Sequence, residues 1–243
     1  MHSVTKGLIL REVPYKDADM MITILTECQG KIAASVRGVR RKSSRMSAAV
    51  QSLAYSEFTL YENGGRITVN EAEALELFFN LRADLAKLAL ASYFADVLDA
   101  ASDEQIANPE LLRLGLNALY ALSNNIAPAA RIKSAFELKI ASLSGYAPAL
   151  LRCHMCGRDD MREGVFKVRD GVLACPNCGG AGMHVDATVL EAMRFIVRED
   201  VKRVFSFALP EAAMDTLAKI CESYLKGQFD REFKTLLFYK SVL

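Results

Sequence analysis

The chain has 243 residues, of which 51% are hydrophobic and 24% are charged, so it can bury a substantial core and is not a disordered polypeptide. Its 30 basic residues almost cancel its 29 acidic ones, which gives a formal net charge of +1. The net charge therefore does not indicate the kind of partner, and only local clusters of charge can do so. No run of roughly 18 uninterrupted apolar residues occurs, and the opening residues lack the apolar core of a signal peptide, so we expect no membrane association.

The first 75 residues show the alternating apolar pattern of β-strands. Strands are expected at residues 7–13, 20–26, 31–39, 53–61 and 66–75. Gln29-Gly30 and the Glu-Asn-Gly-Gly sequence at 62–65 provide hairpin turns, because Asn and Gly tolerate positive φ. Five short strands in so few residues predict a small barrel such as the OB-fold. The strand count alone does not separate an OB-fold from an SH3-like barrel.

Beyond residue 77 the apolar residues follow a helical period. Asn108 and Asp186 are suited to cap helices, Pro109 fits a first helical turn, and Gly145 fits a C-terminal stop. The predicted fold class is α+β, with an N-terminal five-stranded barrel followed by an α-helical domain that carries a cysteine-rich insertion. The helices are expected at residues 77–101, 109–123, 129–145, 187–200, 210–227 and 230–243.

Four of the six cysteines form two CxxC pairs. Cys153 with Cys156 and Cys175 with Cys178 give the spacing C-x2-C-x18-C-x2-C, which is typical of a four-thiolate zinc site. Two residues between the thiols let both sulfurs of a knuckle reach one tetrahedral ion. The alternating residues around Asp170-Gly171 predict a hairpin between the pairs. We therefore expect a zinc ribbon that holds one structural Zn²⁺.

Other interpretations of the cysteines are weaker. A redox CxxC does not explain two matched pairs, and four thiolates leave no open position for catalytic zinc. His154 and His184 lie beside the knuckles as substitute ligands, but four cysteines make them unnecessary. Cys28 and Cys221 are expected to be packed, inert thiols.

The sequence contains no motif of a common enzyme class. GxGxxG after a strand, GxxxxGK[ST], GxSxG and HExxH are all absent, and the three histidines do not pair with a nucleophile at any recognisable spacing. We therefore expect a binding protein and not an enzyme.

A cluster of positive charge follows the third predicted strand. Residues 37–45 contain five basic side chains, and no acidic residue lies between Glu27 and Glu57. A solvated loop, a nuclear-import signal and a phosphate-binding site all fit such a cluster. In an OB-type barrel, loops and faces of this kind bind single strands through charge and base stacking. The aromatic residues available for stacking are Tyr15, Tyr55, Phe58 and Tyr61, although aromatics in small barrels are more often core.

Residues 7–45, GLILREVPYKDADMMITILTECQGKIAASVRGVRRKSSR, resemble the opening of the RecO family of bacterial recombination mediators and DNA-repair proteins. The shared features are a GxxL start, the acidic YKDAD turn, a TxxxG hairpin and a basic GxRRxxSR loop. The resemblance continues through EAEALELFFNLRADL, the helices and the CxxC pairs, so it covers essentially the whole chain. Some members of the family have lost the zinc cysteines, whereas this chain retains all four.

The resemblance implies an OB-fold domain at residues 1–78, an α-helical domain at 79–151 and 184–243, and a zinc-ribbon insertion at 152–183. It also implies binding of single- and double-stranded DNA, annealing of complementary strands, and loading of RecA, together with RecR, onto strands covered by single-strand-binding protein (SSB). Location in the bacterial cytoplasm with the nucleoid follows from that role. The positions that match the family's DNA-binding residues are Lys31, Arg37, Arg40, Arg41, Lys42 and Arg45.

The amino-acid sequence does not assign the SSB-binding residues and leaves two rival functions. The acidic, apolar C-terminal tail of SSB is expected on the helical domain, where residues 202–205 and 231–239 combine basic and apolar side chains, but no pocket residue can be assigned. The rival interpretations are a zinc-ribbon protein–protein adaptor with an incidental basic loop and a metal-dependent nuclease. The lack of clustered carboxylates disfavours the nuclease.

Overall fold

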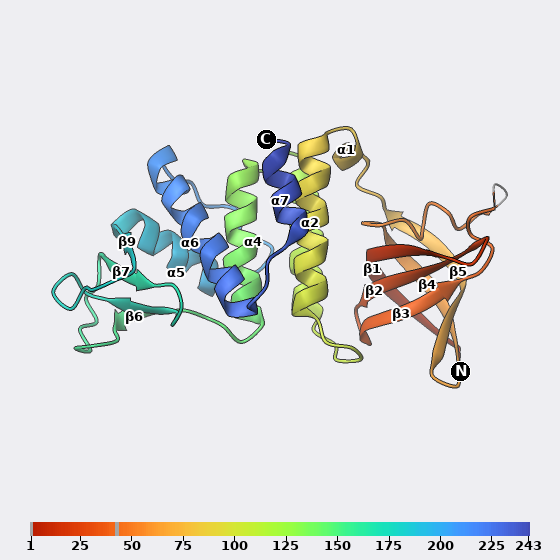
Figure 1. Ribbon diagram of the computed structural model, residues 1–243, viewed down its shortest axis with the longest axis horizontal. Coiled ribbons are helices and arrows are strands. Elements are labelled where there is room, and N and C mark those ends of the chain that lie inside the picture. Colours follow the sequence, from red (N-terminus) through yellow and green to blue (C-terminus); the bar gives the residue numbers. More distant parts are fainter. Residues whose placement is uncertain (1, 42–43) are drawn as a thin grey trace. The chain divides into compact units, whose positions relative to one another are not determined.

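The computed structural model describes residues 2–41 and 44–243, in two compact units (Figure 1). Unit 1 comprises Met1–Asn124 with Phe233–Leu243, and unit 2 comprises Asn125–Glu232. The expected domains divide the chain differently, because they place every helix outside the barrel domain. In the structure, the helices up to residue 124 and the last helix belong to the same unit as the barrel.

Five strands at the start of unit 1 close into a barrel. They are β1 (His2–Tyr15), β2 (Asp19–Thr26), β3 (Gly30–Val36), β4 (Tyr55–Asn63) and β5 (Arg66–Glu76), in the order β1-β2-β3-β5-β4. β1 pairs with both β2 and β4, and the parallel pairing of β3 with β5 closes the barrel. Alternate residues such as Ile22, Ile24 and Phe58 form its core. The predicted five-stranded OB-type barrel is confirmed.

The third strand is shorter than expected. The alternating pattern predicts a strand to residue 39, but β3 ends at Val36. Gly38 has φ +66° and its N–H donates to Asp19 Oδ1 at 2.8 Å, which turns the chain away from the sheet. The apolar residue at position 39 reflects packing of the Val39 side chain into the barrel core and not a continuation of the strand.

The helices of unit 1 are α1 (Phe79–Arg82), α2 (Leu85–Ala101), α3 (Pro109–Ser123) and α7 (Lys234–Ser241). The single helix expected at 77–101 is broken at Asp84, whose Oδ1 accepts from the Lys87 N–H at 3.1 Å and starts a new helix. The predicted cap at Asn108 is confirmed. α7 packs on α2, where the Phe233 ring lies edge-on to Tyr93 at 5.7 Å.

The chain after α2 runs along the start of β3. The Lys31 N–H donates to Asp103 O at 3.3 Å, and the Gln105 N–H donates to Lys31 O at 3.2 Å. Gly30 is required here, because it has φ +65° and a Cβ would lie 2.3 Å from Ile106 O. This close approach joins the barrel to the end of α2.

Unit 2 combines three helices with a small sheet. The helices are α4 (Ala129–Leu143), α5 (Ala187–Arg198) and α6 (Glu211–Phe229). The strands β6 (Ala149–Cys153), β7 (Gly164–Lys167), β8 (Val172–Ala174) and β9 (Met183–Val185) form a sheet in the order β6-β8-β7-β9. The predicted hairpin at Asp170-Gly171 joins β7 to β8, and Asp186 caps α5 by accepting from the Val189 N–H at 2.8 Å.

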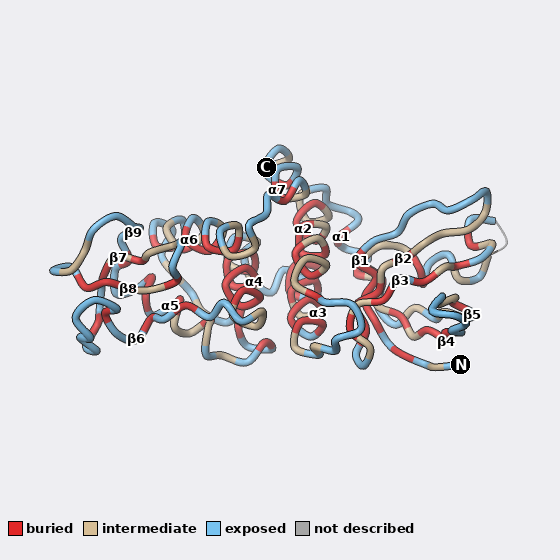
Figure 2. Tube along the Cα trace, turned by 60° about the horizontal axis from the view of Figure 1, so that its bottom comes forward, coloured by how far each residue is buried: buried red, intermediate tan, exposed pale blue. Residues whose placement is uncertain are grey.

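Two buried lysines join the helices of unit 2, and α4, which carries both, is drawn largely red in Figure 2. Lys133 Nζ lies 2.7 Å from Glu137 Oε1 and 3.0 Å from Glu222 Oε2, so it links α4 to α6. Lys139 Nζ donates to Val197 O at 2.9 Å, close to the end of α5. Among the helices of the described residues, none is long and apolar enough to cross a membrane.

Candidate nucleic-acid interface and metal centre

The basic loop, which we define as residues 37–50 after β3, is anchored to the barrel near its start and at its end. The Arg40 N–H donates to Ala18 O at 3.0 Å, which ties the loop to the turn between β1 and β2. Val39 and Val50 are buried in the barrel core. The apolar residues of this segment therefore hold it in place, and its described arginines are left on the outside.

Four of the six predicted DNA-binding residues lie together on this loop. Arg37, Arg40, Arg41 and Arg45 are exposed, and the Arg40 Nη1 donates to the carbonyls of the β1–β2 turn at 3.3 and 3.4 Å. Lys42 lies outside the described residues.

Lys31 lies apart from the other predicted DNA-binding residues. It is at the start of β3, and the strand rise places it roughly 20 Å from Arg37. Its Nζ pairs with Asp99 Oδ1 at 3.0 Å and donates to Asp99 O at 2.6 Å. These contacts give Lys31 a structural role between β3 and α2, and its part in DNA binding stays a prediction.

A groove of about 730 Å³ crosses the barrel face beside the loop, and we call it the barrel groove. All five strands or the residues directly after them contribute to it. Its cations are Lys16, Arg37 and Arg66, and its aromatic residues are Tyr15 and Tyr61. The sequence did not single out Lys16 or Arg66, because each stands alone in its own strand end and only the closed barrel brings them to one face.

The aromatic candidates separate into two groups. Tyr15 and Tyr61 line the barrel groove and are 46% and 38% exposed, which leaves ring surface available for stacking. Phe58 is fully buried in the core. Tyr55 donates to Glu27 Oε1 at 2.8 Å, and burial with this hydrogen bond raises the pKa of Tyr55. The groove thus combines positive charge with two accessible rings.

The four cysteines of the CxxC pairs converge in unit 2. The sulfurs of Cys153, Cys156, Cys175 and Cys178 all lie within 4.8 Å of one another. A tetrahedral ion with Zn–S bonds of about 2.3 Å needs sulfurs about 3.8 Å apart, and Cys156 Sγ lies 3.9 Å from Cys175 Sγ. The donor set therefore fits a single four-coordinate metal ion.

The thiols of Cys153 and Cys178 differ in their surroundings. N–H groups of Cys156 and Cys175 lower the pKa of Cys153 to about 6, whereas hydrogen bonds to the sulfurs of Cys175 and Cys156 raise the pKa of Cys178 to about 12. The pKa of Cys153 is lowered because backbone N–H groups stabilise its thiolate, and the pKa of Cys178 is raised mainly because its thiol hydrogen-bonds to neighbouring sulfurs, with a smaller part from burial and from the charge of Cys153. A divalent cation bound by the sulfurs favours the thiolate form of each ligand.

The remaining sulfur and imidazole groups are outside this cluster. Within the described chain, neither His154 nor His184 belongs to the group of close ligand atoms, and both side chains are exposed. Cys221 is fully buried, and burial raises the pKa of its thiol well above the usual value, as expected for an inert packed cysteine. Cys28 is exposed, so the expectation that it is packed is wrong.

A second groove, of about 550 Å³, lies in unit 2 between α5 and residues 207–209. Phe195 and Phe207 form its apolar part, with ring centroids 5.9 Å apart. Arg198 lines the groove, and the Arg131 guanidinium lies 5.8 Å from the centroid of the Phe207 ring. We call this the helical groove.

The two segments suited to the SSB tail by sequence differ in what they expose. In residues 202–205 the apolar members Val204 and Phe205 are buried, although the segment leads directly into the helical groove. On α7, Leu236 and Tyr239 are buried, whereas Phe238 is 51% exposed.

Comparisons with known proteins agree over nearly the whole length. The N-terminal model of recombination protein O matches residues 1–78, and its C-terminal model matches residues 82–237. A DNA repair protein RecO from Acetivibrio thermocellus is 31% identical over 241 residues, covering 98% of this chain and 96% of the relative. Another, from Alkaliphilus metalliredigens, is 29% identical over 242 residues, covering 98% of each chain.

Proposed function

The chain belongs to the RecO family of DNA-repair proteins, and from this premise we propose that it is a recombination mediator that binds single- and double-stranded DNA through its barrel. In this role it anneals complementary strands and, together with RecR, helps to load RecA onto strands coated with SSB. The observation that carries the proposal is the juxtaposition of the exposed arginines of the basic loop with the barrel groove.

The proposed mechanism makes and breaks no covalent bond. Arg37, Arg40 and Arg41 neutralise phosphates, and this reduces the repulsion that keeps two complementary strands apart. Tyr15 and Tyr61 stack on unpaired bases, which holds a strand with its bases accessible and without sequence preference. Positive charge and stacking together favour an encounter between two strands on one protein surface.

An assay of strand annealing distinguishes a recombination mediator from a protein–protein adaptor. We expect the purified chain to accelerate pairing of two labelled complementary oligonucleotides, with the rate falling as salt is added. The fluorescence energy transfer between the labels measures the rate. An unchanged rate at every protein concentration contradicts the proposal and favours the protein–protein adaptor, whereas magnesium-dependent shortening of the labelled strands favours the nuclease.

Base stacking predicts a specific loss at the two exposed rings. Replacing both Tyr15 and Tyr61 by alanine is expected to weaken single-strand binding by about 2–6 kcal/mol, because each stacked base contributes about 1–3 kcal/mol. Fluorescence anisotropy with a labelled oligonucleotide measures the change. Tyr120→Ala, which removes another exposed ring of unit 1 outside the groove, is the control. Equal affinity of the double variant and the control would exclude stacking in the barrel groove.

We propose that the metal is Zn²⁺, held by Cys153, Cys156, Cys175 and Cys178. Four thiolates in tetrahedral reach are the usual ligand set of structural zinc. The ion supplies a cross-link between the two knuckles, and it leaves no coordination position for a substrate.

The helical groove is the site that we propose for the SSB tail. Phe195 and Phe207 offer an apolar floor, and Arg131 and Arg198 complement acidic side chains and a terminal carboxylate. Tail binding concentrates the protein on coated single strands, because the second contact with the same DNA then becomes intramolecular.

Truncation of one ring tests this site. Phe207→Ala is expected to weaken binding of a synthetic acidic peptide with an apolar C-terminus by at least about tenfold, because a buried aromatic anchor dominates such interfaces. Phe238→Ala removes the exposed ring of the other candidate segment and serves as the control. Isothermal titration gives both constants. If only Phe238→Ala weakens binding of the peptide, the binding site lies on α7 and not in the helical groove.

A further inference from the structure

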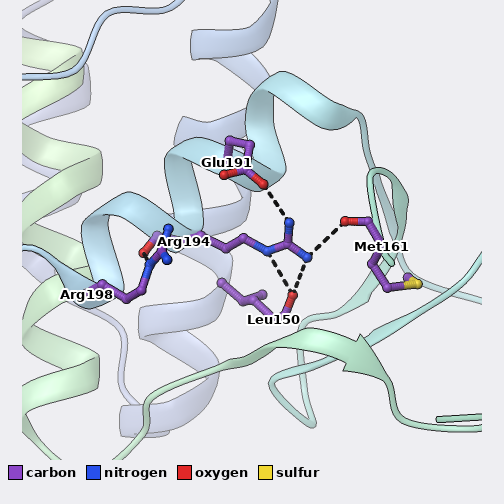
Figure 3. A network of polar contacts seen from close by, with 5 residues as sticks. All are labelled: Leu150, Met161, Glu191, Arg194 and Arg198. Carbon is purple, nitrogen blue, oxygen red and sulfur yellow. Dashed lines mark hydrogen bonds and ion pairs between the residues drawn. The ribbon is translucent and has the colours of Figure 1, made fainter. Parts of the chain in front are cut away.

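Arg194 of α5 binds the backbone of the ribbon at two separate points (Figure 3). Its Nε and Nη2 donate to Leu150 O at 3.1 and 2.9 Å, and Nη2 also donates to Met161 O at 3.0 Å. The remaining nitrogen, Nη1, pairs with Glu191 Oε1 at 2.6 Å. The side chain is only 12% exposed, and all three nitrogens of its guanidinium group have partners.

The two carbonyls lie on either side of the first knuckle. Leu150 precedes Cys153 on β6, and Met161 follows Cys156. Arg194 therefore fastens both ends of the loop that carries the first pair of cysteines to one helix. The helix that provides this attachment begins at Asp186, whose Oδ1 accepts from the Val189 N–H at 2.8 Å.

Lys167 makes the corresponding contacts at the second knuckle. Its Nζ donates to Gly179 O and to Ala181 O, both at 2.6 Å. Gly180 between them has φ +86°, and a Cβ there would lie 3.0 Å from the Lys167 Nζ. The loop that follows Cys178 is thus folded around the ammonium group.

We propose that Arg194 and Lys167 are positioning residues of the metal centre, one for each knuckle. Each uses a single cation to hold two carbonyls of a knuckle loop, so these contacts form together with the metal centre and stabilise the loop conformation in which the four sulfurs reach one ion. Groups that hydrogen-bond metal ligands directly typically change metal affinity by about 10–100-fold when they are removed, and we expect a loss of this order for cations that hold the backbone of the ligand loops. Neither residue contacts the ion itself.

This role differs from the phosphate binding proposed for the basic loop. Four of the five N–H donors of Arg194 are used for backbone and carboxylate oxygens, and two of the three donors of Lys167 are used for carbonyls. Their removal is therefore expected to affect metal affinity and not DNA affinity. The inference rests on the proposed Zn²⁺ site.

Zinc affinity of full-length variants tests the proposal. Lys167→Met and Arg194→Met keep an unbranched apolar stem but lose the donors, and each is expected to weaken Zn²⁺ binding by about 10–100-fold in competition with a chromophoric chelator. Lys167→Arg is expected to restore most of the affinity, and Arg194→Lys only part, because an ammonium does not reproduce the planar fork. Arg169→Met, an exposed cation on the same hairpin, is the matched control for loss of charge. Circular dichroism of the helices accompanies each measurement.

The possible outcomes distinguish an error in the proposed metal from an error in the proposed positioning role. If the unmodified chain binds no Zn²⁺, the proposed metal is wrong. If the unmodified chain binds Zn²⁺ and a methionine variant binds it within about twofold, the positioning role is wrong for that knuckle. An equal loss of Zn²⁺ affinity in Arg169→Met would also overturn the proposal, because the loss would then follow from the removal of any positive charge in the ribbon. Should Arg194→Met lose its helices, Arg194→Lys and the two Lys167 variants decide the question.

Discussion

Replacing Cys175 by serine, or stripping the metal with a strong chelator, is expected to unfold residues 152–184 while the barrel of unit 1 stays folded. The sheet of this segment has only short strands, of three to five residues, and little core of its own. Zinc binding contributes roughly 10–16 kcal/mol in zinc-finger peptides, which is more than a sheet of this size supplies by burial. Loss of one of four ligands therefore removes the main source of order in the ribbon.

Amide hydrogen exchange with metal analysis checks this expectation. Protection is expected to fall across β6 to β9 and to persist in β1 to β5. Cys28→Ser, which changes an exposed cysteine of the barrel unit, is the control and is expected to keep both zinc and protection. Native protection in a metal-free ribbon would show that the four thiols are not a structural metal site.

The second large effect is expected in DNA binding. Replacing Arg40 and Arg41 by alanine removes two exposed cations of the basic loop. At about 0.1 M salt the affinity for a single strand is expected to fall by roughly 10- to 30-fold, and the slope of log K against log salt to shrink by about 1.4, because each phosphate contact contributes about 0.7. The loss is expected to be similar for every base sequence, since phosphate contacts carry no sequence information.

Two further variants make this test specific. Arg113→Ala with Lys219→Ala removes two exposed cations outside the barrel and is expected to leave the slope unchanged. Because Arg40 also donates to the β1–β2 turn, Arg41→Ala with Arg45→Ala reduces the loop charge without breaking those bonds. Equal slopes for all three double variants and the unmodified chain would remove the basic loop from the DNA site.

The sequence predicts the parts of this molecule that depend on local pattern. Alternation of apolar residues gives the five strands, and the CxxC spacing gives the metal cluster. Capping residues give the start of α3 and of α5, but the break at Asp84 was missed because apolar periodicity continues across it.

The rest depends on contacts between distant segments. The family resemblance groups Lys31 with the residues of the basic loop, whereas the structure pairs it with Asp99 on α2. Lys16 and Arg66 join Arg37 only when the barrel closes. Arg194 lies on an ordinary amphipathic helix, and no residue near it in the sequence indicates that its side chain binds the carbonyl of Leu150. Residues of this kind become visible only in the tertiary structure.

The salt dependence of single-strand binding by the unmodified, zinc-loaded chain tests the central claim most directly. If the basic loop and the barrel groove contact about four to six phosphates, log K is expected to fall with log salt with a slope of roughly −3 to −4. A labelled oligonucleotide of mixed sequence and fluorescence anisotropy are sufficient for the measurement. A slope near zero, or no binding at low salt, would contradict the assignment of the barrel as a DNA-binding surface.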